Sequence, residues 1–409
     1  MWRSGAGAGE RRILLADADA FYVSVARLVD PEGAGKAPYL IVGGTAQGRG
    51  VVTSASYEAR KFGVTSAMPT ARALRLCPQA TVVPVSWQAC AAKSRQIREV
   101  MGRFTPVVEA ASQDEFYLDL SGTERLYKDE PLEATARRIR ETVLSETGLS
   151  VSIGGGTSKL VAKMAATLAK PGGVHIVLAG EEAAFMRSFA LGDIPFVGKR
   201  FVERLLRYNL KTVDDALAAG VESLRRWLGE REGTWLWEKI HGRDGGKVVR
   251  RAAAKSISRD ETFAEDIDDD RRLGTELIRL VDRAAGDLRE ASFLARTVSV
   301  RLRDFDFTDR QASRTLDEPV LSDQAVLRVG REMLAKLRKA RTVPARLLGV
   351  QLSSLVREDG AEQLSLLATT GGKDESERER AVARVVDRLR RKLGDDAVAI
   401  GRTPSRRRR

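Results

Sequence analysis

Hydrophobic and polar positions along the first half of the chain predict short strands between amphipathic helices. Residues 13–16 (ILLA) form an apolar run typical of a buried strand, and residues 149–153 (LSVSI) alternate as a second strand does. Between them, residues 132–147 repeat apolar side chains at helical spacing. We therefore expect an α+β core in this part of the chain.

The second half follows a different order of elements. Between residues 255 and 356 the pattern predicts strand, helix, strand, strand, helix and strand, the last five at 271–290, 296–304, 311–317, 323–340 and 346–355. This is the order of a split βαβ sandwich. In the segment TVSVRLR, one face carries Val298, Val300 and Leu302 and the other Ser299, Arg301 and Arg303. The arginine face suits a phosphate backbone, but an ordinary solvated strand face explains the pattern equally well.

Composition and charge narrow the class of protein. With 409 residues and 43% hydrophobic positions, the chain is long enough for several domains. We expect a cytoplasmic protein without membrane contact, because no apolar run reaches the about 18 residues of a membrane span and Asp17 and Asp19 interrupt the N-terminal apolar stretch. The net charge of +13 favours a polyanionic partner, with a merely basic surface as the plain alternative.

Carboxylates are the strongest candidates for chemistry, because the chain has only two histidines. Asp17 follows the first strand directly, and Asp114 and Glu115 precede the apolar run FYLDL. Each acid alone could be a solvated turn residue, but three converging carboxylates raise each other's pKa unless a cation joins them. Mg²⁺ is the hard cation that such oxygen ligands prefer, and two such ions can clamp a phosphoryl transfer.

Four stretches, in order along the chain, resemble the Y-family translesion DNA polymerases of the DinB type. They are DADAFYVSV, VVTSASYEARKFGV, SQDEFYLDL and SIGGGTSKLVAKMAATLAKP, and the resemblance extends over residues 14–356. It implies that Asp17, Asp114 and Glu115 hold two Mg²⁺ ions and that the main-chain carbonyl of Ala18 adds a ligand. Glu115 would ligate or help to orient the catalytic ion.

The resemblance also assigns contacts to the incoming deoxynucleoside triphosphate. Tyr57 and Arg60 offer a hydroxyl and a guanidinium for phosphate oxygens, and Ser54 lies in the same stretch. Tyr22 matches the family's steric gate, a ring beneath the sugar that leaves no room for a 2′-hydroxyl. Phe21 either belongs to the core or packs on the sugar, and paired aromatics more often belong to the core.

Lysines follow the glycine-rich segment GGGTSK. Lys159 begins a helix, where main-chain amides already favour anions, and it resembles a family lysine that contacts the triphosphate. A Walker-type phosphate loop is rejected, because Leu160 stands where that motif needs Ser or Thr. Lys163 and Lys170 are expected on a solvated helix face.

Two regions resemble the DNA-binding parts of the family. The segment IPFVGKRFVERLL resembles a helix-hairpin-helix, in which Gly198 and Lys199 would contact the DNA backbone. Phe196 stands there in place of the usual first glycine. The split βαβ region corresponds to the family's little finger, so that Arg301 and Arg303 would also contact DNA.

A short motif near the C-terminus resembles the bacterial sliding-clamp-binding peptide. In EQLSLL (362–367), the motif residues are Gln363, Leu364, Leu366 and Leu367. The alternative is that these leucines pack with a following helix, whose apolar stripe is Val382, Val385, Val386 and Leu389. The basic end SRRRR would add nonspecific DNA affinity.

The resemblance implies a right-hand polymerase with a ferredoxin-like palm, small fingers, a helical thumb and a little finger. The expected bounds are palm 1–27 and 86–175, fingers 28–85, thumb 176–248, little finger 253–357 and tail 358–409. We expect a monomer that copies primer–template DNA with low fidelity during translesion synthesis. A catalytically inactive accessory subunit and a nucleotide cyclase are the alternatives, although the first class loses its carboxylates and the second leaves the thumb and little finger unexplained.

Overall fold

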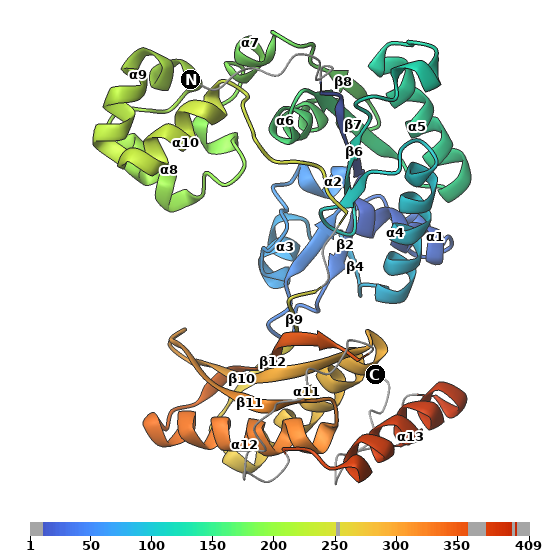
Figure 1. Ribbon diagram of the computed structural model, residues 1–409, viewed down its shortest axis with the longest axis vertical. Coiled ribbons are helices and arrows are strands. Elements are labelled where there is room, and N and C mark those ends of the chain that lie inside the picture. Colours follow the sequence, from blue (N-terminus) through green and yellow to red (C-terminus); the bar gives the residue numbers. More distant parts are fainter. Residues whose placement is uncertain (1–10, 251–253, 359–373, 395–396, 399–409) are drawn as a thin grey trace, which may run out of the picture. The chain divides into compact units, whose positions relative to one another are not determined.

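The chain forms two compact units, Met1–Ala252 and Ala253–Arg409 (Figure 1). The computed structural model describes residues 11–250, 254–358, 374–394 and 397–398. Among the helices in these ranges, none is long and apolar enough to cross a membrane.

The first unit is built around a five-stranded sheet in the order β5-β6-β1-β7-β8. The strands are β1 (Ile13–Ala18), β5 (Val108–Ala110), β6 (Glu115–Asp119), β7 (Val151–Gly156) and β8 (Val174–Ile176). β1 is central and runs antiparallel to both β6 and β7. All six of its residues are buried, which explains its almost unbroken apolar sequence.

Helices cover both faces of this sheet because the buried side chains of β1 alternate. Leu14 and Ala16 pack with the helices α1 (Phe21–Val29), α4 (Trp87–Gly102) and α5 (Leu132–Thr147). Ile13 and Leu15 pack against α6 (Lys159–Ala169) on the opposite face. The predicted helix at 132–147 and the strand 13–16 are therefore confirmed, and the fold is α+β.

A small three-stranded sheet, in the order β3-β2-β4, lies between α1 and α4 in the sequence. Its elements are η1 (Ala34–Lys36), β2 (Leu40–Gly43), β3 (Val52–Ala55), α2 (Tyr57–Arg60), α3 (Thr70–Leu76) and β4 (Thr81–Val83). Ile41, Val52 and Ala73 belong to a core of its own. This modest core fits the small fingers that the sequence predicts.

The rest of the first unit is mostly helical, and its core also includes Leu160 and Met164 of α6. After η2 (Glu124–Tyr127) in the palm, the helical elements are α7 (Glu182–Met186), η3 (Leu191–Asp193), α8 (Lys199–Leu206), α9 (Val213–Leu228) and α10 (Glu230–Ile240). Leu205, Leu224 and Leu236 are buried in this core. It agrees with the helical thumb that the resemblance implies, and the hairpin segment IPFVGK connects η3 to α8.

The second unit is an antiparallel sheet in the order β11-β10-β12-β9 with helices on one face (Figure 1). The elements run β9 (Ser256–Ile267), α11 (Asp270–Glu290), β10 (Phe293–Asp304), β11 (Asp309–Val320), α12 (Asp323–Ala340) and β12 (Ala345–Arg357). This confirms the predicted order of elements. Val298, Val300 and Leu302 are fully buried as expected, but Ser299 is buried too, because its strand is interior and Ser313 and Gln351 flank it.

A further helix, α13 (Glu377–Leu393), attaches to the second unit by ion pairs and by a small apolar contact of Ala383 with Leu294 and Leu321. The Arg289 guanidinium donates to both carboxylate oxygens of Asp387, at 2.6 and 2.8 Å. Ala383 is the buried residue of this helix. The predicted apolar stripe faces outward, since Val382, Val385 and Leu389 are 46%, 47% and 39% exposed.

Candidate active site

Two adjacent strands place the three predicted acids near one another, at the same end of β1 and β6. Asp17, near the end of β1, stands opposite Glu115, the first residue of β6. The amide of Ala18 donates to the carbonyl oxygen of Asp114 at 2.9 Å. Side chains directly opposite in an antiparallel pair share a face of the sheet, so Asp17 and Glu115 are neighbours.

Two lysines form ion pairs with Asp17 and Glu115. Lys170 Nζ lies 2.7 Å from Asp17 Oδ2, and Lys163 Nζ lies 2.6 and 2.8 Å from the two carboxylate oxygens of Glu115. The expectation that both lysines lie on a solvated helix face is wrong. The reason is that α6 packs over β1 and β7, so that Lys163 on this helix reaches Glu115 and Lys170, its C-cap residue, reaches Asp17.

Burial and neighbouring charge both act on Asp17, which is 8% exposed. Burial raises the pKa of this carboxyl group, Lys170 opposes that effect, and the charges of Glu115 and Asp114 raise the pKa further. The carboxylates therefore repel one another, as the sequence argument requires. Asp114 is oriented by Ser112, whose hydroxyl donates to one of its carboxylate oxygens.

The donor set fits a hard divalent cation. Three carboxylates and a main-chain carbonyl are oxygen ligands of the kind that Mg²⁺ prefers. In the described parts of the chain, no three acidic, His or Cys side chains are gathered into a metal-binding group. Lys163 and Lys170 hold the positive charge beside Glu115 and Asp17 instead.

Asp19 is a site residue that the sequence argument did not single out. It is 5% exposed and accepts hydrogen bonds from the hydroxyls of Ser150 and Ser152, both at 2.7 Å. It also accepts from the amide of Gly172 at 2.9 Å and from the Tyr57 hydroxyl at 3.3 Å. This carboxylate fixes the end of β1 to β7, to the loop after α6 and to α2. The signal in the sequence that could have identified Asp19 is the second Asp of the motif DADAF.

The fingers contribute the predicted phosphate-binding pair. The Arg60 guanidinium carbon lies 5.0 Å from the centre of the Tyr57 ring, and its Nε donates to the carbonyl of Ala55 at 2.9 Å. Burial and the nearby Asp19 raise the pKa of Tyr57 to about 12, so the phenol remains a proton donor at neutral pH. Ser54 is buried on β3.

Phe21 and Tyr22 have different surroundings although they are neighbours in sequence. Phe21 is 2% exposed and belongs to the palm core, which favours the core alternative for this residue. Tyr22 is half-buried, and its ring meets those of Phe21 and Trp87 edge-on at centroid distances of 5.3 and 6.1 Å. Aromatic neighbours therefore hold the Tyr22 ring in place.

Lys159 is not among the groups that the fold brings to the three acids. It begins α6, and its Nζ lies 2.7 Å from Glu109 Oε1 and 4.5 Å from the centre of the Tyr117 ring. Lys163 and Lys170 are the lysines beside the acids. Sequence alone gave no reason to prefer them, because all three lysines share one segment.

The predicted DNA contacts lie in both units. Gly198 is the N-cap of α8 and Lys199 is exposed. Arg303 makes two hydrogen bonds of 2.8 Å to Asp309, and Arg301 makes one of 3.1 Å. These hydrogen bonds lower the pKa of Asp309 to about 2. The clamp motif, Gln363, Leu364, Leu366 and Leu367, lies outside the described residues.

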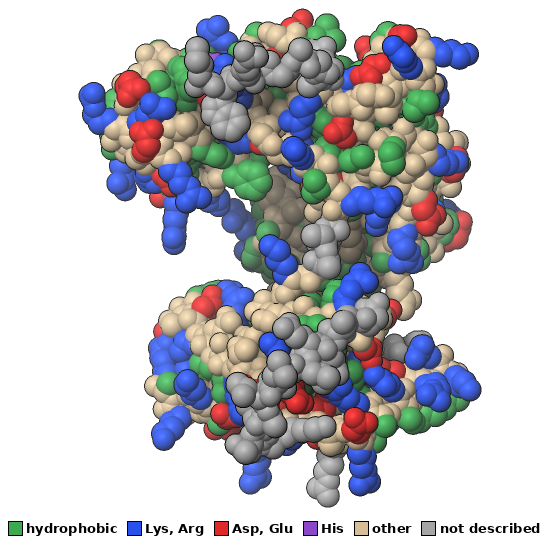
Figure 2. Space-filling view, viewed as in Figure 1, with side chains coloured by type: hydrophobic (Ala, Val, Ile, Leu, Met, Phe, Trp, Pro, Cys, Tyr) green, Lys and Arg blue, Asp and Glu red, His purple; other side chains and the backbone are tan. Residues whose placement is uncertain are grey.

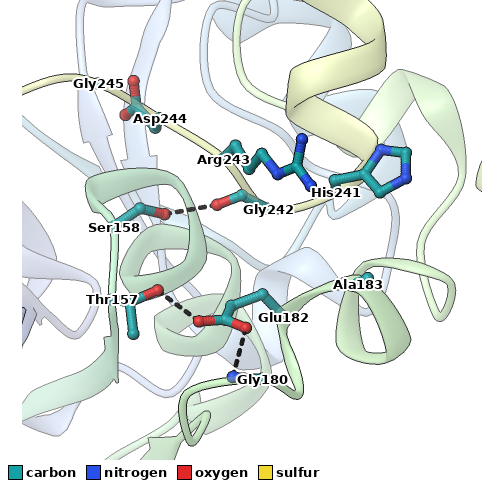
Figure 3. A pocket seen from close by; sticks show the side chains of 10 residues that line it. All are labelled: Thr157, Ser158, Gly180, Glu182, Ala183, His241, Gly242, Arg243, Asp244 and Gly245. Carbon is teal, nitrogen blue, oxygen red and sulfur yellow. Dashed lines mark hydrogen bonds between the residues drawn. The ribbon is translucent and has the colours of Figure 1, made fainter. Parts of the chain in front are cut away.

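A hollow of about 520 Å³ lies where the palm meets the segment after α10 (Figure 3). Thr157 Oγ1 donates to Glu182 at 2.6 Å, and Ser158 Oγ donates to the carbonyl of Gly242 at 2.9 Å. A Cβ on Gly242 would come within 2.7 Å of Glu182 Cβ, which shows how closely the chain passes here. None of the predicted site residues lines this hollow. The hollow therefore lies at the interface between the palm and the thumb.

Comparison with known proteins gives the family. The sequence model of the impB/mucB/samB family matches residues 16–167, and that of its C-terminal domain matches residues 254–366. DNA polymerase IV of Caulobacter vibrioides is 35% identical over 388 residues, which cover 94% of this chain and 92% of the relative. DNA polymerase IV of Alkalilimnicola ehrlichii is also 35% identical, over 87% of this chain and 99% of its own.

The fold has a counterpart among solved structures. A Y-family DNA polymerase chimera that contains Dbh matches 85% of this chain and 99% of its own, with a TM-score of 0.75 and 22% identity. The sequence relatives, the two family models and the order of the elements agree. The chain belongs to the Y-family of DNA polymerases, in its DinB-type group with DNA polymerase IV.

Proposed function

We propose that this protein is a template-directed DNA polymerase that adds deoxynucleotides to a primer 3′ end during low-fidelity translesion synthesis. The observation that carries the proposal is the pairing of Asp17 with Glu115 on adjacent strands, with Asp114 beside them. The palm that holds these acids is the part that matches the impB/mucB/samB family. Curated relatives named DNA polymerase IV match nearly the whole chain.

The reaction is an in-line displacement at phosphorus. The primer 3′-hydroxyl oxygen forms a bond to the α-phosphorus and its proton is lost to solvent, while the bond to the bridging oxygen breaks and pyrophosphate leaves. Asp17, Asp114, Glu115 and the carbonyl of Ala18 would hold two Mg²⁺ ions, which would lower the pKa of the attacking hydroxyl and neutralise charge on the phosphates.

The chain's own residues orient the nucleotide. Tyr57 remains protonated and donates a hydrogen bond, while Arg60 presents a guanidinium suited to two phosphate oxygens. Lys163 and Lys170 compensate the carboxylates until cations replace them, and are then free to meet phosphate oxygens. Tyr22 would sit beneath the sugar and exclude a 2′-hydroxyl.

A primer-extension assay tests this function. Asp114→Ala should abolish extension of a labelled primer, while affinity for primer–template DNA stays close to that of the wild type, because phosphate contacts elsewhere supply it. Glu99→Ala removes an exposed acid of α4 and should extend normally. Extension by the Asp114 variant at the wild-type rate would refute the mechanism. A protein that binds DNA but never extends a primer would be the accessory subunit instead.

The proposed partners are primer–template DNA, deoxynucleoside triphosphates and the bacterial sliding clamp, and the protein would act as a monomer. The clamp proposal rests on Gln363 and the leucines that follow it in EQLSLL. A short peptide of this kind binds weakly alone, but it raises the local concentration of the polymerase on DNA when the clamp is loaded.

A further inference from the structure

The turn before α8 holds Phe196 in a backbone conformation that normally belongs to glycine. The amide of Val197 donates to the carbonyl of Ile194 at 3.0 Å, so Pro195 and Phe196 are the central residues of a β-turn. Phe196 has φ 72°, as expected for the second central residue of a type II turn. Such turns favour Gly or Asn at that position, because a Cβ is strained there.

The core of the thumb enforces this strained turn. Ile194 and Val197, on either side of the central pair, are 1% and 7% exposed and belong to the thumb core. Burying both flanks fixes the path of the chain between them. The side chain of Phe196 then has to project outward, and it is 92% exposed, more than any other large apolar side chain in the described ranges.

A phenylalanine is therefore unfavourable here for two separate reasons, backbone strain and an exposed ring. Neither the turn nor the thumb core gains a contact from the ring, because no aromatic or cation–π contact to Phe196 occurs among the described residues. Strained residues persist mainly where they serve binding or catalysis. An exposed ring on a strained turn is therefore suited to contact a ligand rather than the rest of the protein.

The surroundings of the ring define the chemistry of that ligand. Lys199 and Arg200 are exposed directly after the turn, and Gly198 caps α8 without a side chain, so the first amides of the helix lack an intrahelical acceptor. Lysine and arginine side chains gather on the surface where Figure 1 places α8 (Figure 2). The ligand must therefore combine an anion with an apolar face a few ångströms away.

We propose that the Phe196 ring packs on a deoxyribose of the bound DNA while the cations and amides beside it meet the adjacent phosphate. The sugar–phosphate backbone repeats that pair of groups at every nucleotide. The inference rests on the proposed function, since the DNA is the primer–template duplex of a polymerase. It adds an apolar, sequence-independent contact to a hairpin that would otherwise bind by main-chain amides and charge.

Binding of a fluorescent primer–template duplex across a series of salt concentrations tests the proposal. Phe196→Gly relieves the strained φ and removes the ring, and Phe196→Asn keeps a residue that tolerates the turn. Both variants should raise the Kd about three- to tenfold at every salt concentration, because an apolar contact is lost. The slope of log Kd against log salt should not change, and the thermal midpoint of Phe196→Gly should not fall.

Two controls make the outcome decisive. Lys199→Ala should weaken binding and also reduce the salt slope by about one, as the loss of a phosphate contact does. Leu126→Ala removes an exposed apolar side chain from the palm and should leave the Kd unchanged. If both Phe196 variants bind like the wild type, or lose affinity with a reduced slope, the proposal is overturned. If the wild-type protein itself neither binds nor extends the primer–template, the proposed function fails instead.

Discussion

Lys170 Nζ lies 2.7 Å from Oδ2 of Asp17, so the first carboxylate of the site already has a cationic partner before any substrate arrives. A divalent ion that binds Asp17 through this oxygen would have to displace the ammonium group. The lysine therefore offsets the cost of burying this carboxylate, and it would compete with a metal ion for the same oxygen.

Substitution of Lys170 tests two effects separately: the stabilisation of buried Asp17 and the competition with a metal ion. Lys170→Met should lower the thermal midpoint without Mg²⁺ by about 2–4 °C, because Asp17 remains buried without a partner. Added Mg²⁺ should then raise the midpoint of the variant more than that of the wild type. Lys336→Met, which changes an exposed lysine of α12, is the matched control. Equal Mg²⁺ shifts in wild type and Lys170→Met would show that lysine and metal do not compete.

The neighbours Phe21 and Tyr22 should respond differently to truncation. Phe21→Ala empties a core position and should cost about 3–5 kcal/mol of unfolding free energy. Tyr22→Ala should keep the fold and the use of deoxynucleotides but admit ribonucleotides much more readily. Primer extension with each nucleotide type measures the second effect, and thermal unfolding the first. Unchanged sugar selectivity in Tyr22→Ala would place the gate elsewhere.

Asp309 holds two arginines that could otherwise meet DNA phosphates. Asp309→Asn frees Arg301 and Arg303, and should tighten nonspecific DNA binding at low salt and steepen its salt dependence by about one phosphate contact. Asp306→Asn, which loosens Arg341 from the same hairpin, is the comparison variant. The salt dependence of Kd is the measurement. If neither Kd nor slope changes in Asp309→Asn, the arginine face is an ordinary solvated surface.

Asp323 predicts a pH dependence of stability in the second unit. Burial raises its pKa to about 6, although Arg289, 3.2 Å away, opposes the shift. Between about pH 4 and pH 6 the folded state keeps a proton that the unfolded state has lost, so stability falls as pH rises through this range. From pH 5 to 7, the wild type should lose about 1 kcal/mol relative to Asp323→Asn. Thermal unfolding followed by circular dichroism at both pH values measures this, and a gain by the wild type would mean that Arg289 dominates.

The clamp motif can be tested apart from catalysis. A double variant, Gln363→Ala with Leu366→Ala, should extend primers as the wild type does without the clamp. On primed circular DNA with a loaded clamp, it should lose the increase in product length that the wild type gains, because the tether is absent. Product lengths on denaturing gels report this. Full stimulation of the double variant would assign these side chains to packing.

Much of the fold follows from local patterns in the sequence. The apolar run at 13–16 is a strand because both faces of the palm sheet are covered, and the helix at 271–290 carries an apolar stripe that fills the second core. The acids could be placed because they lie at the ends of two apolar runs, ILLA and FYLDL, whose strands pair in the sheet. For these acids, the adjacent apolar residues in the sequence were enough to predict where the acids lie in the structure.

Other contacts depend on packing that no local pattern contains. Lys163 and Lys170 look like solvated helix residues, and only the placement of α6 over the sheet shows that they reach Glu115 and Asp17. The stripe on α13 has the spacing of a buried face, yet the helix is held by ion pairs on its other side. Periodicity identifies a face of a helix but not the neighbour that the face meets.

The attachment of α13 to the second unit has a consequence for the proposed clamp motif, which lies between β12 and α13 in the sequence. The described residues on both sides of this motif are fixed to the second unit: the Glu358 amide donates to the carbonyl of Ser292, and the Glu375 carboxylate accepts from the amide of Leu321. A sliding clamp bound to the proposed motif would therefore be linked to the second unit through both β12 and α13. Two such links would restrain the rotation of the little finger as well as its distance from the clamp.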